Sequence, residues 1–203
     1  ARAWFWDARG VKIFVPNSGH LGNIEGFLRH YDPDEPFVLT VTFHGRWVSV
    51  HPMVLAMVAC VAASAREAGV AIDVEVPTIR SLPYLVRMGL FEHLGADPGI
   101  TVTEHESAGR FIPITQIRSN DELQQFIVDM IPLLHCAPDE AEPIKYVISE
   151  MVRNALEHSA SPVGAFVCAQ SFKTRNRLAV GIADAGRGIN ASQVIHSFGG
   201  KTV

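Results

Sequence analysis

Three features are missing from this sequence, and each absence excludes a class of function. There is no excess of positive charge, because 17 lysines and arginines stand against 21 acidic residues for a net charge of −4. Nucleic-acid binding through phosphate contacts depends on clustered positive charge, so we expect no nucleic-acid partner. No apolar run is long enough for a membrane span: Pro52 to Ala65 is nearly all apolar but shorter than the roughly 20 residues that a spanning helix needs. We expect a buried helix there and no membrane association.

The chain also lacks a cysteine pattern for disulfides or a metal. Cys60, Cys136 and Cys168 are an odd number and each lies in apolar sequence, which predicts buried free thiols. None of the nine histidines has the H-x-x-x-H or cysteine-containing spacing of a zinc site. Free thiols and the absence of a signal peptide indicate a cytoplasmic protein. The first residue is alanine, so we expect the natural N-terminus to be missing.

The first half alternates predicted strands with predicted helices. The residue types predict strands at residues 11–16, 37–43 and 70–76, extended sequence at 100–105 and 111–114, and helices at 20–31, 52–67 and 81–88. Alternation of this kind predicts a sheet covered by helices. Residues 37–43 have too little polar alternation for a half-exposed strand, so we expect that strand to be central.

The second half begins with helix signals. Ser119 and Glu122 form a capping box, and the following apolar residues recur on one helical face (Leu123, Phe126, Ile127, Met130, Ile131 and Leu134). Pro132 is expected to kink or end this helix. The polar residues 137–143 then lead into a second helix, whose predicted core-facing stripe has the same spacing (Ile144, Val147, Ile148, Met151, Val152, Ala155 and Leu156).

Polar residues line one edge of that second helix. Glu150, Asn154 and His158 follow one another at i, i+4 and i+8, which places a carboxylate, an amide and an imidazole along one ridge. Two predicted strands follow, at residues 163–169 and 178–183, joined by a polar connection. The second strand runs into Asp184-Ala185-Gly186-Arg187-Gly188, where glycines permit close backbone approach and the carboxylate can accept a hydrogen bond from an amino group.

This combination resembles the GHKL ATP-binding fold of DNA gyrase, sensor histidine kinases and anti-sigma-factor kinases. Glu150 and Asn154, with His158 after them, match the E-x-x-x-N box of that family, and Asp184, Gly186 and Gly188 match its D-x-G-x-G box. The resemblance implies ATP and Mg²⁺ as cofactors. It assigns Mg²⁺ to Asn154, orientation or deprotonation of the attacking group to Glu150, and the adenine amino group to Asp184. His158 either contacts phosphate or caps the helix.

Other interpretations of the same residues are available. A dinucleotide-binding fingerprint fits Gly186-x-Gly188-x-x-Ala191, but no acidic residue follows at the required distance. The GGKT of residues 199–202 imitates a P-loop, but Ile195 occupies the place of its first glycine. The third alternative is structural: a solvated helix edge and an ordinary turn.

The first half resembles a STAS-type domain, the fold of anti-sigma-factor antagonists. The resemblance depends on the order strand, loop, apolar helix, strand, and on the segment Leu82 to Phe91. Ser49 lies near the serine that some family members phosphorylate, but the aspartate and glycine of D-x-S-G are missing, so Ser49 is expected to neighbour a helix N-cap without chemistry.

The expected fold class is therefore α/β, with a STAS-like domain at residues 1–115 and a GHKL-type α/β sandwich at 116–203 that is incomplete, because no second glycine-rich box follows Gly188. Three functions follow from the resemblances. The first is a Mg-ATP-binding serine/threonine kinase of the anti-sigma-factor type, fused to its STAS-like partner or sensor, with a protein partner from sigma-factor regulation. The second is an ATPase that switches conformation. The third is a non-catalytic interaction protein, and a homodimer is compatible with each.

Overall fold

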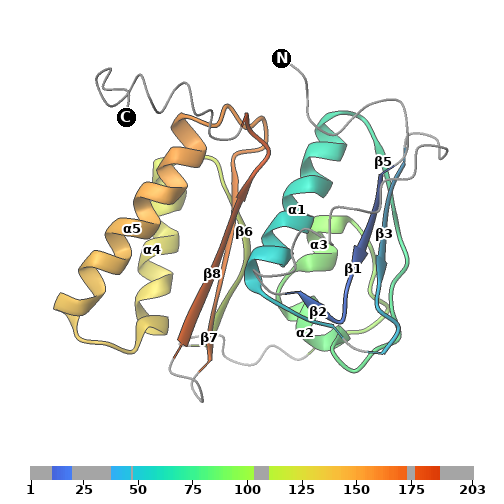
Figure 1. Ribbon diagram of the computed structural model, residues 1–203, viewed down its shortest axis with the longest axis horizontal. Coiled ribbons are helices and arrows are strands. Elements are labelled where there is room, and N and C mark those ends of the chain that lie inside the picture. Colours follow the sequence, from blue (N-terminus) through green and yellow to red (C-terminus); the bar gives the residue numbers. More distant parts are fainter. Residues whose placement is uncertain (1–10, 20–37, 47, 103–109, 173–176, 188–203) are drawn as a thin grey trace, which may run out of the picture.

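The computed structural model describes residues 11–19, 38–46, 48–102, 110–172 and 177–187. These residues form a mixed α/β structure with two three-stranded sheets and, among the described residues, five helices. The predicted helix at 20–31 and the glycine at position 188 lie outside them. Figure 1 shows four layers in sequence: the helices α4 and α5, the sheet of β6 to β8, the helices α1 to α3, and the sheet of β1, β3 and β5.

The N-terminal sheet is parallel, with β3 (Val38–Phe43) between β1 (Val11–Val15) and β5 (Ala71–Val74). The predicted central position of residues 37–43 is thereby confirmed. The two-residue strands β2 (Ser18–Gly19) and β4 (Ser49–Val50) pair beside it. Residues 100–102, predicted to be extended, form no strand, and the rest of that segment lies outside the described residues.

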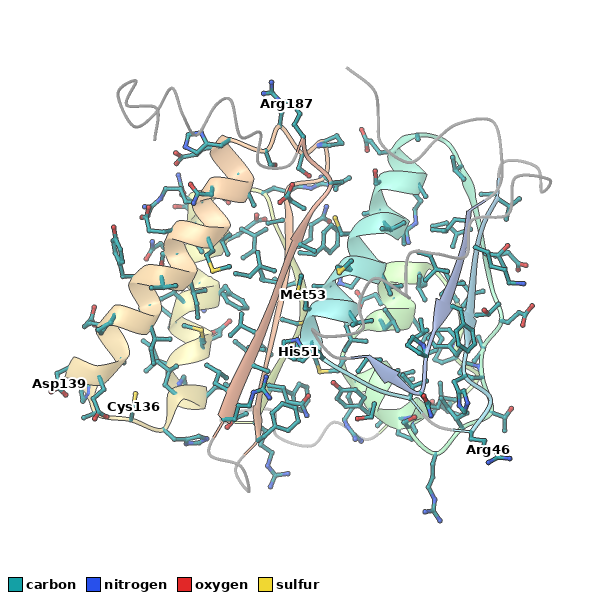
Figure 2. The ribbon with its side chains drawn as sticks, viewed as in Figure 1. Arg46, His51, Met53, Cys136, Asp139 and Arg187 are labelled. Atoms are coloured by element: carbon teal, nitrogen blue, oxygen red, sulfur yellow. The ribbon has the colours of Figure 1, made fainter. Side chains whose placement is uncertain are left out.

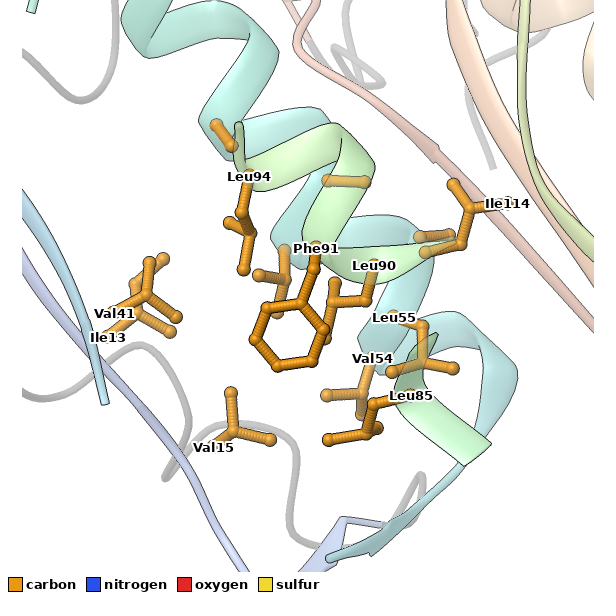
Figure 3. Close-up of a cluster of buried hydrophobic side chains, with 14 of the residues drawn as sticks. Ile13, Val15, Val41, Val54, Leu55, Leu85, Leu90, Phe91, Leu94 and Ile114 are labelled. Atoms are coloured by element: carbon orange, nitrogen blue, oxygen red, sulfur yellow. The ribbon is translucent and has the colours of Figure 1, made fainter. Parts of the chain in front are cut away.

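Helix α1 (Pro52–Glu67) lies between the two larger sheets (Figure 1). It begins at His51, whose ring Nδ1 accepts a hydrogen bond from the Met53 N–H at 3.2 Å, so His51 is the N-cap and Ser49 lies near it, as predicted. The short helices α2 (Leu82–Arg87) and α3 (Leu90–Leu94) complete this layer. Phe91 of α3 is buried at the centre of the apolar cluster in Figure 3, where Val15 and Val41 of the parallel sheet and Val54 of α1 lie around it.

The C-terminal sheet is antiparallel, in the order β6 (Phe111–Ile117), β7 (Ala165–Phe172) and β8 (Arg177–Asp184). The two strands predicted before the glycine-rich turn are confirmed. The segment 111–114 was assigned to the N-terminal half; instead it is the start of β6, which pairs with β7. The pairing is irregular between Ile112 and Thr115, where Pro113 has no N–H to donate.

Strand β7 is buried on both faces, which explains its continuous apolar sequence. Ala165, Val167 and Ala169 contact the core beneath α4 and α5, whereas Phe166 and Cys168 contact the core around α1. The Cys168 thiol donates a hydrogen bond to the Pro52 carbonyl oxygen at 3.1 Å. The core around α1 therefore contains residues from both halves of the chain.

Helices α4 (Asn120–Leu134) and α5 (Pro138–Glu157) cover the other face of this sheet. The capping box is confirmed: the Glu122 N–H donates to Ser119 Oγ at 3.2 Å, and the Ser119 N–H donates to Glu122 Oε2 at 3.0 Å. These backbone N–H groups help to hold the pKa of Glu122 below its usual value, the Arg118 N–H most strongly.

Two boundary predictions need correction. Pro132 does not end α4, which continues to Leu134 and stops at His135, a residue with φ of 50°; a kink at Pro132 stays a prediction. Pro132 removes the helical donor of the Val128 carbonyl oxygen, and Val128 is exposed, so water can replace that donor. Residues 138–143 are also not a linker, because they form the first turns of α5 with Pro138 at its start.

The three cysteines differ in exposure, which corrects the prediction that all are buried. Cys60 and Cys168 are buried, and burial raises the pKa of each thiol to about 12. Cys136 is exposed in the connection between α4 and α5 (Figure 2). Among the described residues, no helix has both the length and the apolar content to cross a membrane.

These exposures predict a labelling pattern. At pH 7 a thiol reagent such as 5,5′-dithiobis-(2-nitrobenzoic acid) should modify Cys136 rapidly, because the reagent reaches only an exposed thiol. Cys60 and Cys168 should react only after denaturant is added. The Cys136→Ser variant should lose the fast phase and keep both slow thiols; two fast thiols in the native protein contradict the fold described above.

Candidate functional site

Helix α5 carries the first group of predicted site residues, Glu150 and Asn154, and it ends at His158. Its first turn is stabilised by Pro138 at the first helical position and by Asp139 and Glu140 at the positive end of the helix dipole. Glu140 Oε2 also accepts a hydrogen bond from the Ala137 N–H at 3.2 Å. At the other end, His158 is the C-cap, and its N–H donates the last helical hydrogen bond, to the Asn154 carbonyl oxygen at 3.0 Å. The predicted capping position of His158 is thus observed.

The predicted core-facing stripe of α5 is only half correct. Ile148, Val152 and Ala155 are buried, and Ala141 extends the buried stripe into the first turns. Ile144, Val147 and Met151 are instead exposed, because the sheet beneath covers a narrower arc of the helix than the apolar residues occupy. Asn154 and His158 are exposed and Glu150 is half-buried.

Strand β8 places the second group. It ends at Asp184, which is exposed and occupies the same side of the sheet as α5, because its partner in β7 is Ala165. Asp184 Oδ1 accepts a hydrogen bond from the Gly186 N–H at 2.8 Å and so shapes its own turn. Among the described residues Oδ2 makes no hydrogen bond, which leaves an acceptor for an incoming amino group.

Ser159 joins the two groups. The Arg187 N–H donates to the Ser159 carbonyl oxygen at 2.8 Å. Gly186 lies against the same residue so closely that a Cβ at position 186 would be 2.6 Å from the Ser159 carbonyl carbon. Only glycine allows this approach. The turn after β8 is therefore fixed to the backbone that immediately follows Asn154 and His158.

A second serine strengthens this junction. Ser161 Oγ accepts a hydrogen bond from the Ala185 N–H at 3.2 Å and donates to the Gly164 carbonyl oxygen at 2.7 Å. The Ser161 N–H donates to Ser159 Oγ at 3.0 Å, and Ser159 Oγ donates to the Ala155 carbonyl oxygen. Neither serine was a predicted site residue. The sequence feature that could have indicated them is Ser-x-Ser-Pro directly after the helix, because serines in such segments often form local hydrogen bonds from side chain to backbone.

The negative charge of Asp184 affects the pKa of a buried thiol in α1. The pKa of Cys60 is raised first by burial and second by the negative charge of Asp184, so the carboxylate lies close enough to α1 to disfavour a thiolate. Asp184, at the end of β8, therefore interacts electrostatically with Cys60 in the N-terminal half. Figure 2 shows Arg187 beyond this end of the strand.

Glu150 is engaged within its own helix. Its carboxylate forms an ion pair with the Arg153 guanidinium, and the Arg153 Nε lies 4.0 Å from Glu157 Oε1. Within the described part of the chain no hydrogen bond or ion pair joins Asp184 to Glu150, Asn154 or His158. The structure thus brings the turn to the end of α5, but it does not connect the individual side chains.

The donor set suits a magnesium nucleotide better than a metal held by protein alone. Asn154 and Glu150 offer oxygen atoms, which Mg²⁺ prefers, and Mg²⁺ bound with a nucleotide takes only one or two protein ligands. No three His, Cys, Asp or Glu side chains in the described ranges lie close enough to hold a metal ion. Asp184 Oδ2, which makes no hydrogen bond to the residues that the structure describes, is an acceptor that an amino group could use.

A separate cavity lies in the N-terminal half. It has a volume of about 510 Å³ and adjoins the segment between β5 and α2. Its walls are mostly apolar or proline side chains, Arg80 is their only charged residue, and none of the predicted site residues takes part. We take the junction at Ser159 as the candidate site, because the turn after β8 and the end of α5 meet there.

No family model, curated protein or solved structure matches this chain.

Proposed function

We propose that this chain is a Mg-ATP-binding regulatory protein whose C-terminal half acts as a serine/threonine kinase resembling those of anti-sigma factors. One observation carries the proposal: Gly186 is packed on Ser159, so the D-x-G turn and the end of the E-x-x-x-N helix form one continuous structure. The contact between Gly186 and Ser159 requires glycine, so the glycine of the D-x-G turn has a structural role at the end of the E-x-x-x-N helix.

Each site residue has a distinct role in this proposal. Asp184 binds the adenine amino group through Oδ2, because Oδ1 is already occupied by the Gly186 N–H. Asn154 holds Mg²⁺ from the exposed edge of α5. Glu150 orients the attacking hydroxyl group once its carboxylate leaves Arg153. Mg-ATP supplies the phosphoryl group, and the Mg²⁺ neutralises its developing charge.

The N-terminal half is the partner or sensor in this proposal. Its parallel sheet and apolar helix agree with the STAS-like order of elements, and α1 packs directly on β7 and β8. A change in the N-terminal half would therefore reach β8, the strand that ends at Asp184. The protein partner is a component of sigma-factor regulation.

A specific observation favours a second function, that of a non-catalytic nucleotide-dependent interaction protein. Glu150 is already neutralised by Arg153, and Arg153 also lies near Glu157. A carboxylate oxygen engaged by a guanidinium is not free to accept a hydrogen bond from an attacking hydroxyl group. In this function ATP binds at the same residues and no phosphoryl group is transferred.

Titration calorimetry with Mg-ATP tests both functions. The protein should bind Mg-ATP, and Asp184→Asn should weaken binding about tenfold or more, because an amide presents an N–H₂ group to the adenine amino group in one of its two orientations. The exposed Asp129→Asn serves as the matched control and should bind normally. If there is no heat with wild-type protein, or if both variants bind equally, nucleotide binding at this site is refuted.

A second experiment separates the roles on α5. Asn154→Ala should weaken binding only when Mg²⁺ is present, whereas Glu150→Ala should leave binding intact and abolish phosphate transfer measured with γ-labelled ATP. Glu157→Ala is the control, since it removes another carboxylate near Arg153 and should change neither quantity. Label on protein supports the kinase, free labelled phosphate supports an ATPase, and ATP binding with neither supports the interaction protein. Equal losses in Asn154→Ala and Glu150→Ala contradict the assigned roles.

A further inference from the structure

Exposed apolar side chains are concentrated on the two helices of the C-terminal half. Of the eight large hydrophobic residues that are exposed in the described part of the chain, six lie on α4 or α5. Three of the six share one edge of α5: Ile144, Val147 and Met151, which are 38%, 54% and 52% exposed. We refer to these three residues as the α5 strip.

The α5 strip has the spacing of a helix-packing surface. Its members are separated by three and four residues, and the next positions in the same series are Asn154 and His158. Alternating intervals of three and four place residues in line along one helical edge. An apolar line of this kind normally packs against another helix.

The strip lies beside the buried side of α5. Ile148, Val152 and Ala155 form that buried line; the strip flanks it on one side, and the half-buried residues Lys145 and Ser149 flank it on the other. Figure 1 shows α5 running in the same direction as β8. Strand β8, which α5 contacts, pairs only with β7 among the described residues.

Negative charge surrounds the strip. Glu140 lies one turn before Ile144 on the same edge, and Asp184 lies beyond the far end on the same side of the sheet. Residues 120–157, which comprise α4, α5 and their connection, contain eight acidic and two basic residues, a balance of −6. The remaining residues contain thirteen acidic and fifteen basic residues, a balance of +2, so the charge is strongly asymmetric.

We propose that the α5 strip is the docking site for a basic amphipathic helix of a protein partner. The apolar residues of that helix, spaced by three and four, cover Ile144, Val147 and Met151, and its lysines or arginines meet Glu140 and, when no nucleotide is bound, Asp184. A second copy of this chain is a poorer occupant. Whether two copies pair parallel or antiparallel along α5, acidic ends meet acidic ends.

A designed peptide tests the docking site directly. The probe is a fluorescein-labelled peptide with leucines spaced by three and four and lysines at both ends, and its comparison peptide has glutamates in place of the lysines. Fluorescence anisotropy should show saturable binding of the lysine peptide alone. Raising the salt concentration should weaken that binding, because the flanking contacts are exposed ion pairs.

Two matched variants locate the binding surface. Val147→Glu should weaken peptide binding about tenfold or more, because it places a charge in the middle of the apolar contact. Val128→Glu adds the same charge at an equally exposed position on the outer side of α4 and should bind as wild type. Circular dichroism melting curves confirm that both variants are folded.

Several results overturn the proposal. The strip is not the docking site if no saturable binding occurs, if the glutamate peptide binds equally well, or if Val147→Glu and Val128→Glu bind alike. Sedimentation analysis supplies the remaining outcome: if wild-type protein is a dimer that Val147→Glu dissociates, a second copy occupies the strip instead. None of these outcomes depends on ATP binding.

Discussion

Replacement of Gly181 by alanine should destabilise the protein by about 3 kcal/mol, the upper end of the usual cost of overpacking. Gly181 lies in β8 against the first turn of α1, and a Cβ there would be 2.6 Å from the Met53 Cα. Figure 2 shows Met53 beside this sheet. The nearest atoms belong to the backbone of Pro52 and Met53, which cannot rotate away, so α1 must move off the sheet.

Urea unfolding followed by circular dichroism measures this loss. Gly45→Ala is the control, because nothing lies within 4 Å of a Cβ at that position, and its stability should change by less than about 0.5 kcal/mol. Displacement of α1 also removes the hydrogen bond between Cys168 and the Pro52 carbonyl oxygen. The Cys168 thiol should therefore react with a thiol reagent in Gly181→Ala. Wild-type stability together with an unreactive Cys168 contradicts the shared core.

Replacement of Gly186 by alanine should reduce Mg-ATP affinity at least tenfold, if the proposed nucleotide site is correct. The added Cβ meets the Ser159 backbone and forces the turn away from the end of α5. Asp184 then loses the hydrogen bond from the Gly186 N–H that fixes Oδ1, and its distance from Asn154 changes. Calorimetry gives the affinity, and the shift in unfolding temperature on adding Mg-ATP gives an independent measure.

Two controls separate a local effect from general unfolding. The buried thiols of Cys60 and Cys168 should remain unreactive in Gly186→Ala at the temperature of the titration, which shows that the core is intact. Ser161→Ala removes the hydrogen bond to the Ala185 N–H without introducing a clash, and should weaken affinity by a smaller factor. Wild-type affinity in Gly186→Ala shows that the turn takes no part in binding.

The sequence predicted elements well where the local pattern was strong. The capping box of Ser119 and Glu122 and the two strands before Asp184 have short-range causes, so they were recognised correctly. The effect of proline was harder to predict, because proline is compatible with more than one context. Pro138 begins a helix although its polar segment was expected to precede one, and Pro132 is accommodated near a helix end.

The site was predictable in part, for a different reason. The spacing of Glu150 and Asn154 fixes their edge of the helix, but only tertiary contacts decide how much of that edge is exposed. Val147 appeared to belong to the core stripe and is 54% exposed, because the sheet covers one side of α5 and leaves the other uncovered. The junction at Ser159 depends on a contact between backbones that no side-chain pattern records.

Strand β8 connects the start of α1 to Asp184. Gly181 rests on the start of α1, and Asp184 lies three residues further along the same strand, at about 10 Å for the usual rise of a strand. An extended backbone bonded along β7 is stiff over this length. If α1 tilts where Gly181 contacts it, we expect β8 to carry that displacement to the carboxylate of Asp184.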